Sequence, residues 1–321
     1  MGDADVVVLR QTIHGLGAEE LAATLRGRLP EASVAVARTP AEERSLLETA
    51  RIAVGLDISE PQLATAENLT LFACVFAGTG HLPLDALEDH GVAVTNASGV
   101  HGPNISEYVI GAMITHARQF TRAHRQQERR EWRGYETTEL YGCTVAVVGL
   151  GAIGDAIVDR LEPFGVHTVG VRYSPEKGGP TDEVYGFDEF HEAVWDAEYV
   201  VLACPLTETT RGLVDADALR TLRSDAVLIN VARGAVVDTD ALVSELQNNR
   251  IRGAALDVTD PEPLPEDHPL WGLGNVTITP HNAGYTPEYF ERLADVVVDN
   301  VERLEATRDD ETDASLRNRV V

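Results

Sequence analysis

The chain has 321 residues, of which 44% are hydrophobic, and a formal net charge of −26 at neutral pH. This length accommodates about two packed domains, and the strongly negative field disfavours nucleic-acid and anionic-membrane partners. Arginine supplies every side-chain cation of the Lys and Arg type except Lys177. High acidity with almost no lysine favours a protein adapted to a salt-rich cytosol, where salt screens the carboxylates from one another, over acidity for solubility alone.

The sequence carries no recognisable targeting or metal-binding pattern. No cationic segment followed by an apolar run opens it, and no apolar run has the length of a transmembrane helix, so we expect a cytoplasmic protein. The three cysteines lie far apart in apolar contexts without zinc spacing: Cys74, Cys143 and Cys204. We therefore expect inert, buried thiols and no metal site.

The first hundred residues alternate short apolar runs with amphipathic stretches. Residues 18–29 predict a helix between the first two strands. The predicted strands are residues 5–10, 32–38, 51–56, 69–76 and 91–96. This alternation is typical of a parallel sheet that helices cover on both faces.

A long segment at residues 103–133 interrupts this alternation and predicts a helix. It carries six arginines between Arg118 and Arg133. One interpretation is contact with the acidic surface of a second subunit, which predicts a homodimer; the other is a solvated helix face. The negative net field disfavours a nucleic-acid patch here.

The alternation resumes at residue 143 and indicates a second α/β domain. Residues 288–306 predict a last helix with one apolar face, which would return the chain to the first domain. The predicted strands of the second domain are residues 144–148, 167–173, 198–204, 226–232, 252–258 and 276–281.

A glycine-rich turn follows the first of these strands and opens an amphipathic helix. Gly149 would permit the tight turn, Gly151 a close approach of the backbone to a pyrophosphate, and Gly154 close packing of helix on strand. The phosphates would lie on the helix N-terminus, at the amides near Ala152 and Ile153. The motif predicts a dinucleotide site; the alternative is a glycine-rich turn without a ligand.

The next strand ends in Arg172, where an acid would bind a ribose 2′-hydroxyl. A guanidinium has no acceptor atoms but pairs well with phosphate. Ser174 can donate to the same group, and Tyr173 and Lys177 lie beside it in the sequence. We therefore predict that NADP(H) is the preferred cofactor, with some use of NAD(H). The alternative is that Arg172 lies over the adenine while NAD binds.

Three further strand ends carry residues suited to catalysis. Arg233 follows one strand, Asp257 the next, with Glu262 in the proline-rich loop beyond it, and His281 follows the last. Taken singly, Arg233 could form a surface ion pair, Glu262 could be one acid among many and His281 a loop histidine. Because open parallel sheets bind ligands at the carboxyl ends of their strands, we expect the set to converge there.

Together these stretches resemble the D-isomer-specific 2-hydroxyacid dehydrogenase family over nearly the whole chain. The resemblance rests on "GLGAIG", "CPLTETTRGLVDADAL", "LINVARGAVVDTDAL", "ALDVTDPEPL", "NVTITPHNAGYT" and the late "LRNRVV". It implies an α/β fold of two doubly wound parallel-sheet domains with a cleft between them. These are a flavodoxin-like substrate domain of residues 1–100 and 286–321 and a Rossmann dinucleotide-binding domain of residues 101–285.

The resemblance also implies roles for individual residues. Arg233, Glu262 and His281 would be catalytic, and the backbone amides of Ala77 and Gly78 would bind the substrate carboxylate together with Arg233 and His281. The implied cofactor contacts beyond the glycine turn and Arg172–Ser174 are Cys204, Pro205, Thr210, Val231, Ala232, Arg233, Asp257, His281, Ala283 and Gly284.

The implied reaction is reduction of a 2-oxo acid by NADPH to a D-2-hydroxy acid. His281 would donate the proton, Glu262 would raise the pKa of its imidazolium, and Arg233 would orient the substrate and stabilise developing charge. Gly80 and Pro83 replace the acids usual in the substrate loop, which leaves substrate size open. A glyoxylate/hydroxypyruvate reductase is the enzymatic alternative, and an NAD(P)H-sensing scaffold of the corepressor type is the non-enzymatic one.

Overall fold

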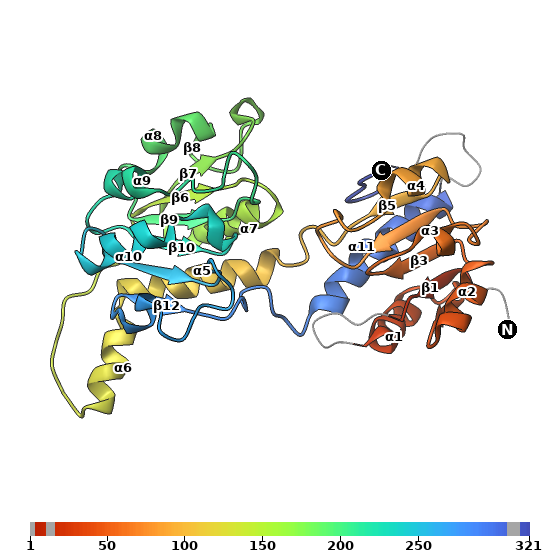
Figure 1. The fold of residues 1–321 in the computed structure, drawn as a ribbon, viewed down its shortest axis with the longest axis horizontal. Coiled ribbons are helices and arrows are strands. Elements are labelled where there is room, and N and C mark those ends of the chain that lie inside the picture. The colour runs from red at the N-terminus through yellow and green to blue at the C-terminus, as the bar shows by residue number, and fades with distance from the viewer. Residues whose placement is uncertain (1–3, 11–16, 307–314) are drawn as a thin grey trace. The chain divides into compact units, whose positions relative to one another are not determined.

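The computed structural model describes residues 4–10, 17–306 and 315–321, and the chain divides into two compact units (Figure 1). Unit 1 comprises residues 1–100 and 285–321, and unit 2 comprises residues 101–284. Each unit consists of one parallel sheet with helices on both faces.

Unit 1 is built on five parallel strands in the order β2-β1-β3-β4-β5. In β1, Val7 lies opposite Ala35 on one side and Ala53 on the other. Successive residues of a strand point to opposite faces, so the apolar run of β1 supplies both cores. The strands are β1 (Val6–Val8), β2 (Val34–Val36), β3 (Ile52–Gly55), β4 (Leu71–Cys74) and β5 (Ala93–Thr95).

Two helices cover one face of this sheet and three cover the other. The long α11 buries Phe290, Leu293, Val297 and Val301 against α1 and the sheet, which confirms the apolar face predicted for residues 288–306. The helices are α1 (Ala18–Arg28) and α11 (Tyr289–Ala306) on one face, and α2 (Pro40–Leu47), α3 (Glu60–Leu63) and α4 (Leu84–Asp89) on the other.

Unit 2 is built on seven parallel strands in the order β12-β11-β10-β9-β6-β7-β8. The order reverses at β6, and the carboxyl end of such a reversal point is where open α/β sheets bind ligands. The strands are β6 (Thr144–Val148), β7 (His167–Val171), β8 (Glu183–Tyr185), β9 (Tyr199–Leu202), β10 (Val227–Asn230), β11 (Gly253–Leu256) and β12 (Val276–Ile278).

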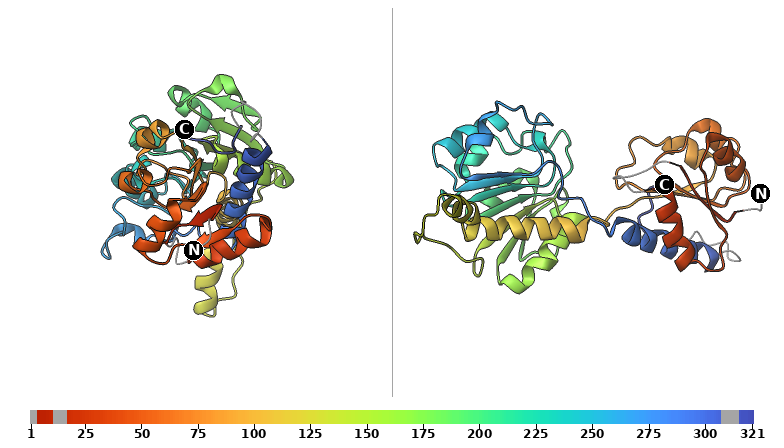
Figure 2. Two further views of the ribbon diagram at one scale, coloured as in Figure 1. Left: turned by 90° about the vertical axis from the view of Figure 1, so that its right-hand side faces the viewer. Right: turned by 90° about the horizontal axis from the view of Figure 1, so that it is seen from below.

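Helices also cover both faces of this second sheet. α5 and α7 pack on one face, and Figure 2 shows α5 running along it; α8, α9 and α10 pack on the other. The helices are α5 (Gly102–Ala117), α6 (Phe120–Glu128), α7 (Ala152–Leu161), α8 (Phe190–Val194), α9 (Ala216–Thr221) and α10 (Thr239–Gln247). Single 3-10 turns are η1 (Glu162–Phe164), η2 (Pro175–Lys177), η3 (Phe187–Glu189), η4 (Gly234–Val236) and η5 (Pro269–Gly272).

The expectation of one long helix at residues 103–133 is wrong. α5 ends at Ala117, Gln119 adopts a left-handed backbone with φ of 50°, and α6 leads off in a new direction before the chain continues without helix from Arg129. The amide of Thr138 then donates to Ala117 O at 3.0 Å, returning the chain to the end of α5. We call residues 118–138 the arm.

The prediction of an α/β fold with two parallel-sheet domains is confirmed. Across residues 4–10, 17–306 and 315–321, no helix has both the length and the apolar composition that crossing a membrane requires.

Candidate active site

The glycine turn after β6 is packed too tightly to admit side chains at two of its three glycines. Gly149 has a φ of +106°, and a Cβ there would lie 2.6 Å from the backbone N and Cα of Cys204. A Cβ on Gly154 would lie 2.0 Å from Gly149 O, so the first turn of α7 rests directly on the loop. Any larger residue would clash at these two positions, as the motif predicts.

Gly151 has a different environment, because nothing lies within 4 Å of its Cβ position. It is the N-cap of α7, no side chain caps this helix end, and Gly151 and Ala152 are exposed. Such an end presents backbone N–H groups and the positive end of the helix dipole. The tight turn and the uncapped helix end fit a dinucleotide pyrophosphate.

A pocket of about 410 Å³ lies beside this turn and contains Arg172. Arg172 donates from Nη1 to Gly178 O at 2.6 Å, which fixes its guanidinium at the pocket wall. None of the described residues that line the pocket is an acid. The lining residues are Gly149, Leu150, Arg172, Tyr173, Ser174, Lys177, Phe187, Ala203, Cys204, Pro205, Thr207, Thr209 and Thr210.

The sequence reasoning missed one acid near this pocket, Asp155 in the first turn of α7. Its Oδ1 is buried without a hydrogen-bond partner among the described residues. Burial raises the pKa of Asp155, and the nearby Arg172 partly opposes that shift. Asp155 follows the glycine motif directly, but only the fold brings its charge near Arg172.

Arg233 follows β10 in a loop that a buried asparagine holds. Asn230 Oδ1 accepts from Ala232 N at 3.0 Å, and its Nδ2 donates to Arg233 O at 3.0 Å. A Cβ on Gly234 would lie 2.0 Å from Thr259 O, so this loop packs against the loop after β11. The sequence reasoning did not predict Asn230 as a site residue. Its only signal in the sequence was that a polar residue ends an apolar strand.

His281 and Glu262 form a hydrogen-bonded pair, with 3.1 Å between His281 Nδ1 and Glu262 Oε2. The other carboxylate oxygen, Oε1, accepts from Thr259 N at 3.1 Å. Both side chains are about half exposed. The structure thus brings together a histidine and an acid that lie 19 residues apart in the chain.

Asp257 organises the loop that carries His281. Its backbone oxygen accepts from His281 N at 2.8 Å. Its carboxylate accepts from Thr279 Oγ1 at 2.6 Å, Asn282 N at 2.8 Å and Ala283 N at 2.9 Å. Asp257 is only 3% exposed, so these bonds form away from bulk water. A carboxylate in this position fixes the backbone on both sides of the histidine.

These loops all follow the carboxyl ends of strands of one parallel sheet and so lie along one edge of the unit 2 sheet (Figure 1). Gly149 follows β6, Arg172 follows β7, Arg233 follows β10, and His281 follows β12. Of the other predicted cofactor residues, Ala152 and Ile153 form the start of α7, and Val231, Ala232, Ala283 and Gly284 lie in the loops after β10 and β12.

The two remaining predicted substrate residues lie in unit 1. Ala77 and Gly78 follow the carboxyl end of β4, and both are exposed. Ala77 O accepts from Asn96 Nδ2 at 2.7 Å, which holds the loop from one side. The Cβ positions of Gly78 and Gly80 have no neighbour within 4 Å, so no other described residue packs closely against this side of the loop.

The prediction of buried cysteines is confirmed for two of the three. Cys74 and Cys204 are buried and Cys143 is partly buried, and all three are free thiols. Burial raises the pKa of Cys204 to about 11, so its thiol stays protonated at neutral pH. In the described part of the chain, no group of three His, Cys, Asp or Glu side chains could hold a metal ion.

The chain is similar to a family of known proteins. Residues 110–283 match the family model described as "D-isomer specific 2-hydroxyacid dehydrogenase, NAD binding domain". The chain is 35% identical to the glyoxylate reductase of Thermofilum pendens, over 74% of this chain and 72% of that protein. It is 30% identical to the D-3-phosphoglycerate dehydrogenase of Methanocaldococcus jannaschii over 85% of this chain, but it spans only 53% of that longer relative.

A solved structure is similar over almost the full length. The D-isomer specific 2-hydroxyacid dehydrogenase of Xanthobacter autotrophicus, in complex with NADPH and MES, superposes with a TM-score of 0.79 at 29% identity. The match covers 99% of this chain and 98% of that one.

Proposed function

Because the chain belongs to the D-isomer specific 2-hydroxyacid dehydrogenase family, we propose that it reduces a 2-oxo carboxylic acid to a D-2-hydroxy acid with NADPH. The observation that carries the proposal is the His281–Glu262 pair, which shares a sheet edge with Arg233 and the glycine turn. In this proposal unit 2 binds the dinucleotide, and unit 1 contributes the substrate loop.

The bound NADPH supplies the hydride that reduces the substrate carbonyl. Gly149, Gly151 and Gly154 would shape the pyrophosphate turn, with the amides of Ala152 and Ile153 as donors. The preference for NADPH is supported by the pocket at Arg172. None of the described residues that line this pocket is an acid. An acidic side chain there would repel a 2′-phosphate and would bind a 2′-hydroxyl instead.

Ser174 and Lys177 line the same pocket as Arg172 and would add a hydroxyl donor and a second cation. A guanidinium has five N–H donors. One donor of Arg172 binds Gly178 O, so four remain for a phosphate. A guanidinium fork matches phosphate geometry better than a single ammonium does. We therefore assign the main contribution to Arg172.

His281 is the proton donor in this proposal. Glu262 engages its Nδ1, and Nε2 has no hydrogen-bond partner among the residues that the structure describes. Nε2 is therefore the nitrogen that would deliver a proton to the substrate oxygen. The Glu262 carboxylate faces the positive charge that the ring carries when protonated, while Thr259 N keeps that carboxylate in place.

Arg233 would bind and orient the substrate. Its Nη1 donates to Ala232 O at 2.6 Å, which leaves further donors for the carboxylate and carbonyl oxygens of a 2-oxo acid. The exposed amides of Ala77 and Gly78 would take the substrate carboxylate in unit 1. A fixed cation beside the carbonyl oxygen also stabilises the negative charge that develops there.

A glyoxylate/hydroxypyruvate reductase is the second candidate, and the similarity to the glyoxylate reductase of Thermofilum pendens favours it. The chemistry is the same on a smaller substrate. The open space around Gly78 and Gly80 sets no tight limit on side-chain size from unit 1. A cofactor-sensing scaffold is the non-enzymatic candidate, and it would bind NADPH without oxidising it.

We further propose a homodimer in the cytoplasm of a salt-rich cell. The arm exposes half of Phe120 and the whole of Trp132 together with its arginines, and such aromatic and arginine residues are enriched at subunit interfaces. Sedimentation in molar potassium chloride tests the dimer, and thermal unfolding with and without that salt tests salt adaptation. A monomer under these conditions argues against the dimer, and full stability without salt argues against salt adaptation.

The decisive experiment measures initial rates of NADPH and NADH oxidation with glyoxylate, pyruvate, hydroxypyruvate and 2-ketoisocaproate. We expect NADPH to be preferred, and Arg172→Asp to reverse the preference because the new acid repels a 2′-phosphate and accepts from the ribose hydroxyls. An unchanged preference would show that Arg172 does not determine the choice between NADPH and NADH. Tight binding of NADPH without any oxidation would instead support the cofactor-sensing scaffold.

A further inference from the structure

His281 has a backbone conformation that a histidine rarely adopts without support. Its φ is 52°, in the left-handed region where a side chain crowds the backbone. A residue keeps such a conformation only where the surrounding structure holds it there. The inner support is the Asp257 carboxylate, which accepts from the two amides that follow the histidine. An outer support comes from helix α5.

Two polar side chains of α5 reach the segment of residues 279–283, which we call the histidine loop. Asn104 and Tyr108 are four positions apart, so they lie on one face of the helix. Asn104 Nδ2 donates to Ala283 O at 2.8 Å. Tyr108 Oη lies 2.8 Å from Thr279 Oγ1. The two side chains therefore contact the first and the last residue of the histidine loop.

The hydrogen bond between Tyr108 and Thr279 has a defined direction. A hydroxyl has one hydrogen, and Thr279 donates its own to Asp257 Oδ1 at 2.6 Å, because a carboxylate can only accept. Tyr108 is therefore the donor to Thr279 Oγ1. Burial raises the pKa of Tyr108 to about 12, so the phenol keeps its hydrogen at physiological pH. A chain of donors thus runs from α5 through Thr279 to the Asp257 carboxylate.

Helix α5 is itself packed against the helix that follows the glycine turn. A Cβ on Gly102, the first residue of α5, would lie 2.9 Å from Ala156 Cβ in α7. Further along α5, Val109 and Met113 are fully buried in the core cluster that also contains Ala283. One helix therefore contacts both α7 and the histidine loop.

We propose that Asn104 and Tyr108 are positioning residues that set the place of His281 relative to the bound cofactor. This inference rests on the proposed function, because it takes His281 as the proton donor. Neither side chain is assigned to substrate or cofactor, and each acts through the histidine loop. Asn104 holds one end through a backbone oxygen, and Tyr108 holds the other end through Thr279 and Asp257.

Two substitutions remove these contacts one at a time, and a third serves as the matched control. Tyr108→Phe removes one hydroxyl, and Asn104→Ala removes one amide. The control is Tyr199→Phe, because Tyr199 also packs in the core of unit 2 and also donates to α5, at Met113 O. Tyr199 is the first residue of β9, so it lies at the amino end of the sheet, whereas the histidine loop follows a carboxyl end.

Hydrogen–deuterium exchange of the whole protein tests the contacts without reference to catalysis. Asp257 accepts from the amides of Asn282 and Ala283. We expect peptides that cover these amides to exchange about fivefold faster in Tyr108→Phe and in Asn104→Ala, which is the effect of about one lost hydrogen bond on local opening. Peptides that cover residues 149–154 should exchange as in the parent. Unchanged exchange of the histidine loop in both variants overturns the proposal.

Steady-state kinetics test the consequence for the reaction, with NADPH and the 2-oxo acid that the parent reduces fastest. We expect kcat to fall about tenfold in Tyr108→Phe and in Asn104→Ala. The KM for the 2-oxo acid should stay near that of the parent, because Arg233 binds the substrate from another loop. The isotope effect on kcat, measured with NADPH deuterated at the transferred hydrogen, should rise as the chemical step becomes slower.

Two results contradict the positioning role. One is a lower Tm in the variants with parent kinetics below the transition, which would show that the contacts only stabilise the fold. The other is an equal kcat and isotope effect in Tyr108→Phe and Tyr199→Phe.

Failure of the proposed function gives a different result. If the parent oxidises no NADPH with any 2-oxo acid, the reaction assigned to His281 is wrong, and the positioning role is wrong with it. The exchange experiment still decides whether α5 holds the histidine loop, because it needs no turnover.

Discussion

Replacing Asp257 tests whether one buried carboxylate positions the histidine loop. In the structure this carboxylate accepts from Ala283 N at 2.9 Å, Asn282 N at 2.8 Å and Thr279 Oγ1 at 2.6 Å. Asp257→Ala removes both carboxylate oxygens and with them all three hydrogen bonds. The segment on either side of His281 then loses these side-chain bonds, while the bond from His281 N to the backbone oxygen of residue 257 remains.

The expected loss of stability follows from these three donors. The amide of Ala283 is buried, and an unpaired buried donor costs about 1–3 kcal/mol. Asn282 is exposed and can turn to water, so its lost bond costs about 1 kcal/mol. The hydroxyl of Thr279 keeps Tyr108 as a partner at 2.8 Å and adds little. The sum is about 2–4 kcal/mol, which lowers Tm by about 4–15 °C.

Thermal unfolding and steady-state kinetics together provide the assay. A displaced His281 should also lower kcat by about a hundredfold, since an error of about 1 Å at a reacting group has that effect. Asp257→Asn, which keeps one oxygen, should fall between the parent and Asp257→Ala. Asp267→Ala is the control, because it removes an exposed acid from the same loop region. If Asp257→Ala matches this control in both Tm and kcat, the positioning argument is refuted.

Three further outcomes are expected. His281→Gln should lower kcat by about 10²–10⁴-fold without weakening NADPH binding, measured by fluorescence titration; a normal kcat excludes it as the proton donor. Gly154→Ala puts a Cβ 2.0 Å from Gly149 O and should lower both Tm and cofactor affinity, unlike Gly111→Ala, whose Cβ position is open. Burial, with repulsion from Arg252, lowers the pKa of His116 to about 4 in the folded protein against its ordinary value of 6.5, so the folded state binds fewer protons than the unfolded state between these two pH values. Its contribution to stability is full above pH 6.5 and is lost as pH falls toward 4. His116→Asn should therefore flatten the pH dependence of urea unfolding relative to the parent across this window, and equal slopes contradict the assignment.

The sequence predicts the features that depend on local pattern. Apolar runs identify every described strand except β8, and the spacing of Gly149, Gly151 and Gly154 after one of them identifies the turn, because tight turns and close packing leave glycine as the residue that fits. Parallel strands share an edge, so the alignment of Arg233 and His281 along it also follows from their positions at strand ends.

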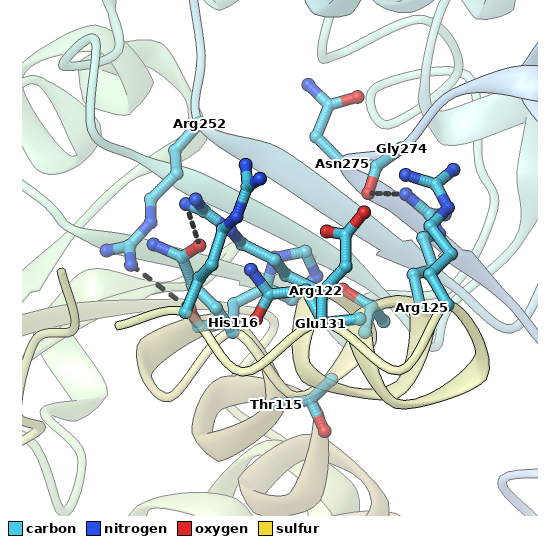
Figure 3. A pocket seen from close by; sticks show the side chains of 13 residues that line it. Thr115, His116, Arg122, Arg125, Glu131, Arg252, Gly274 and Asn275 are labelled. Atoms are coloured by element: carbon cyan, nitrogen blue, oxygen red, sulfur yellow. Dashed lines mark hydrogen bonds between the residues drawn. The ribbon is translucent and has the colours of Figure 1, made fainter. Parts of the chain in front are cut away.

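Features set by tertiary contacts could not be predicted in this way. The break between α5 and α6 depends on the left-handed backbone of Gln119. Glutamine rarely adopts this conformation, so the sequence does not predict it. Asn230 and Asp257 act through hydrogen bonds to loops whose paths only the fold defines. The pocket lined by Arg125, Arg252 and Gly274 (Figure 3) brings the arm together with residues that lie more than a hundred positions further along the chain.

The single lysine of the chain makes the pocket at Arg172 accessible to selective chemistry. Lys177 is exposed at that pocket, and no other side chain in the sequence carries a primary amine. An amine-reactive fluorophore will therefore label Lys177 and the amino terminus alone. Because NADPH would shield the former and not the latter, the ratio of the two labels reports occupancy of the pocket without any change to the amino-acid sequence.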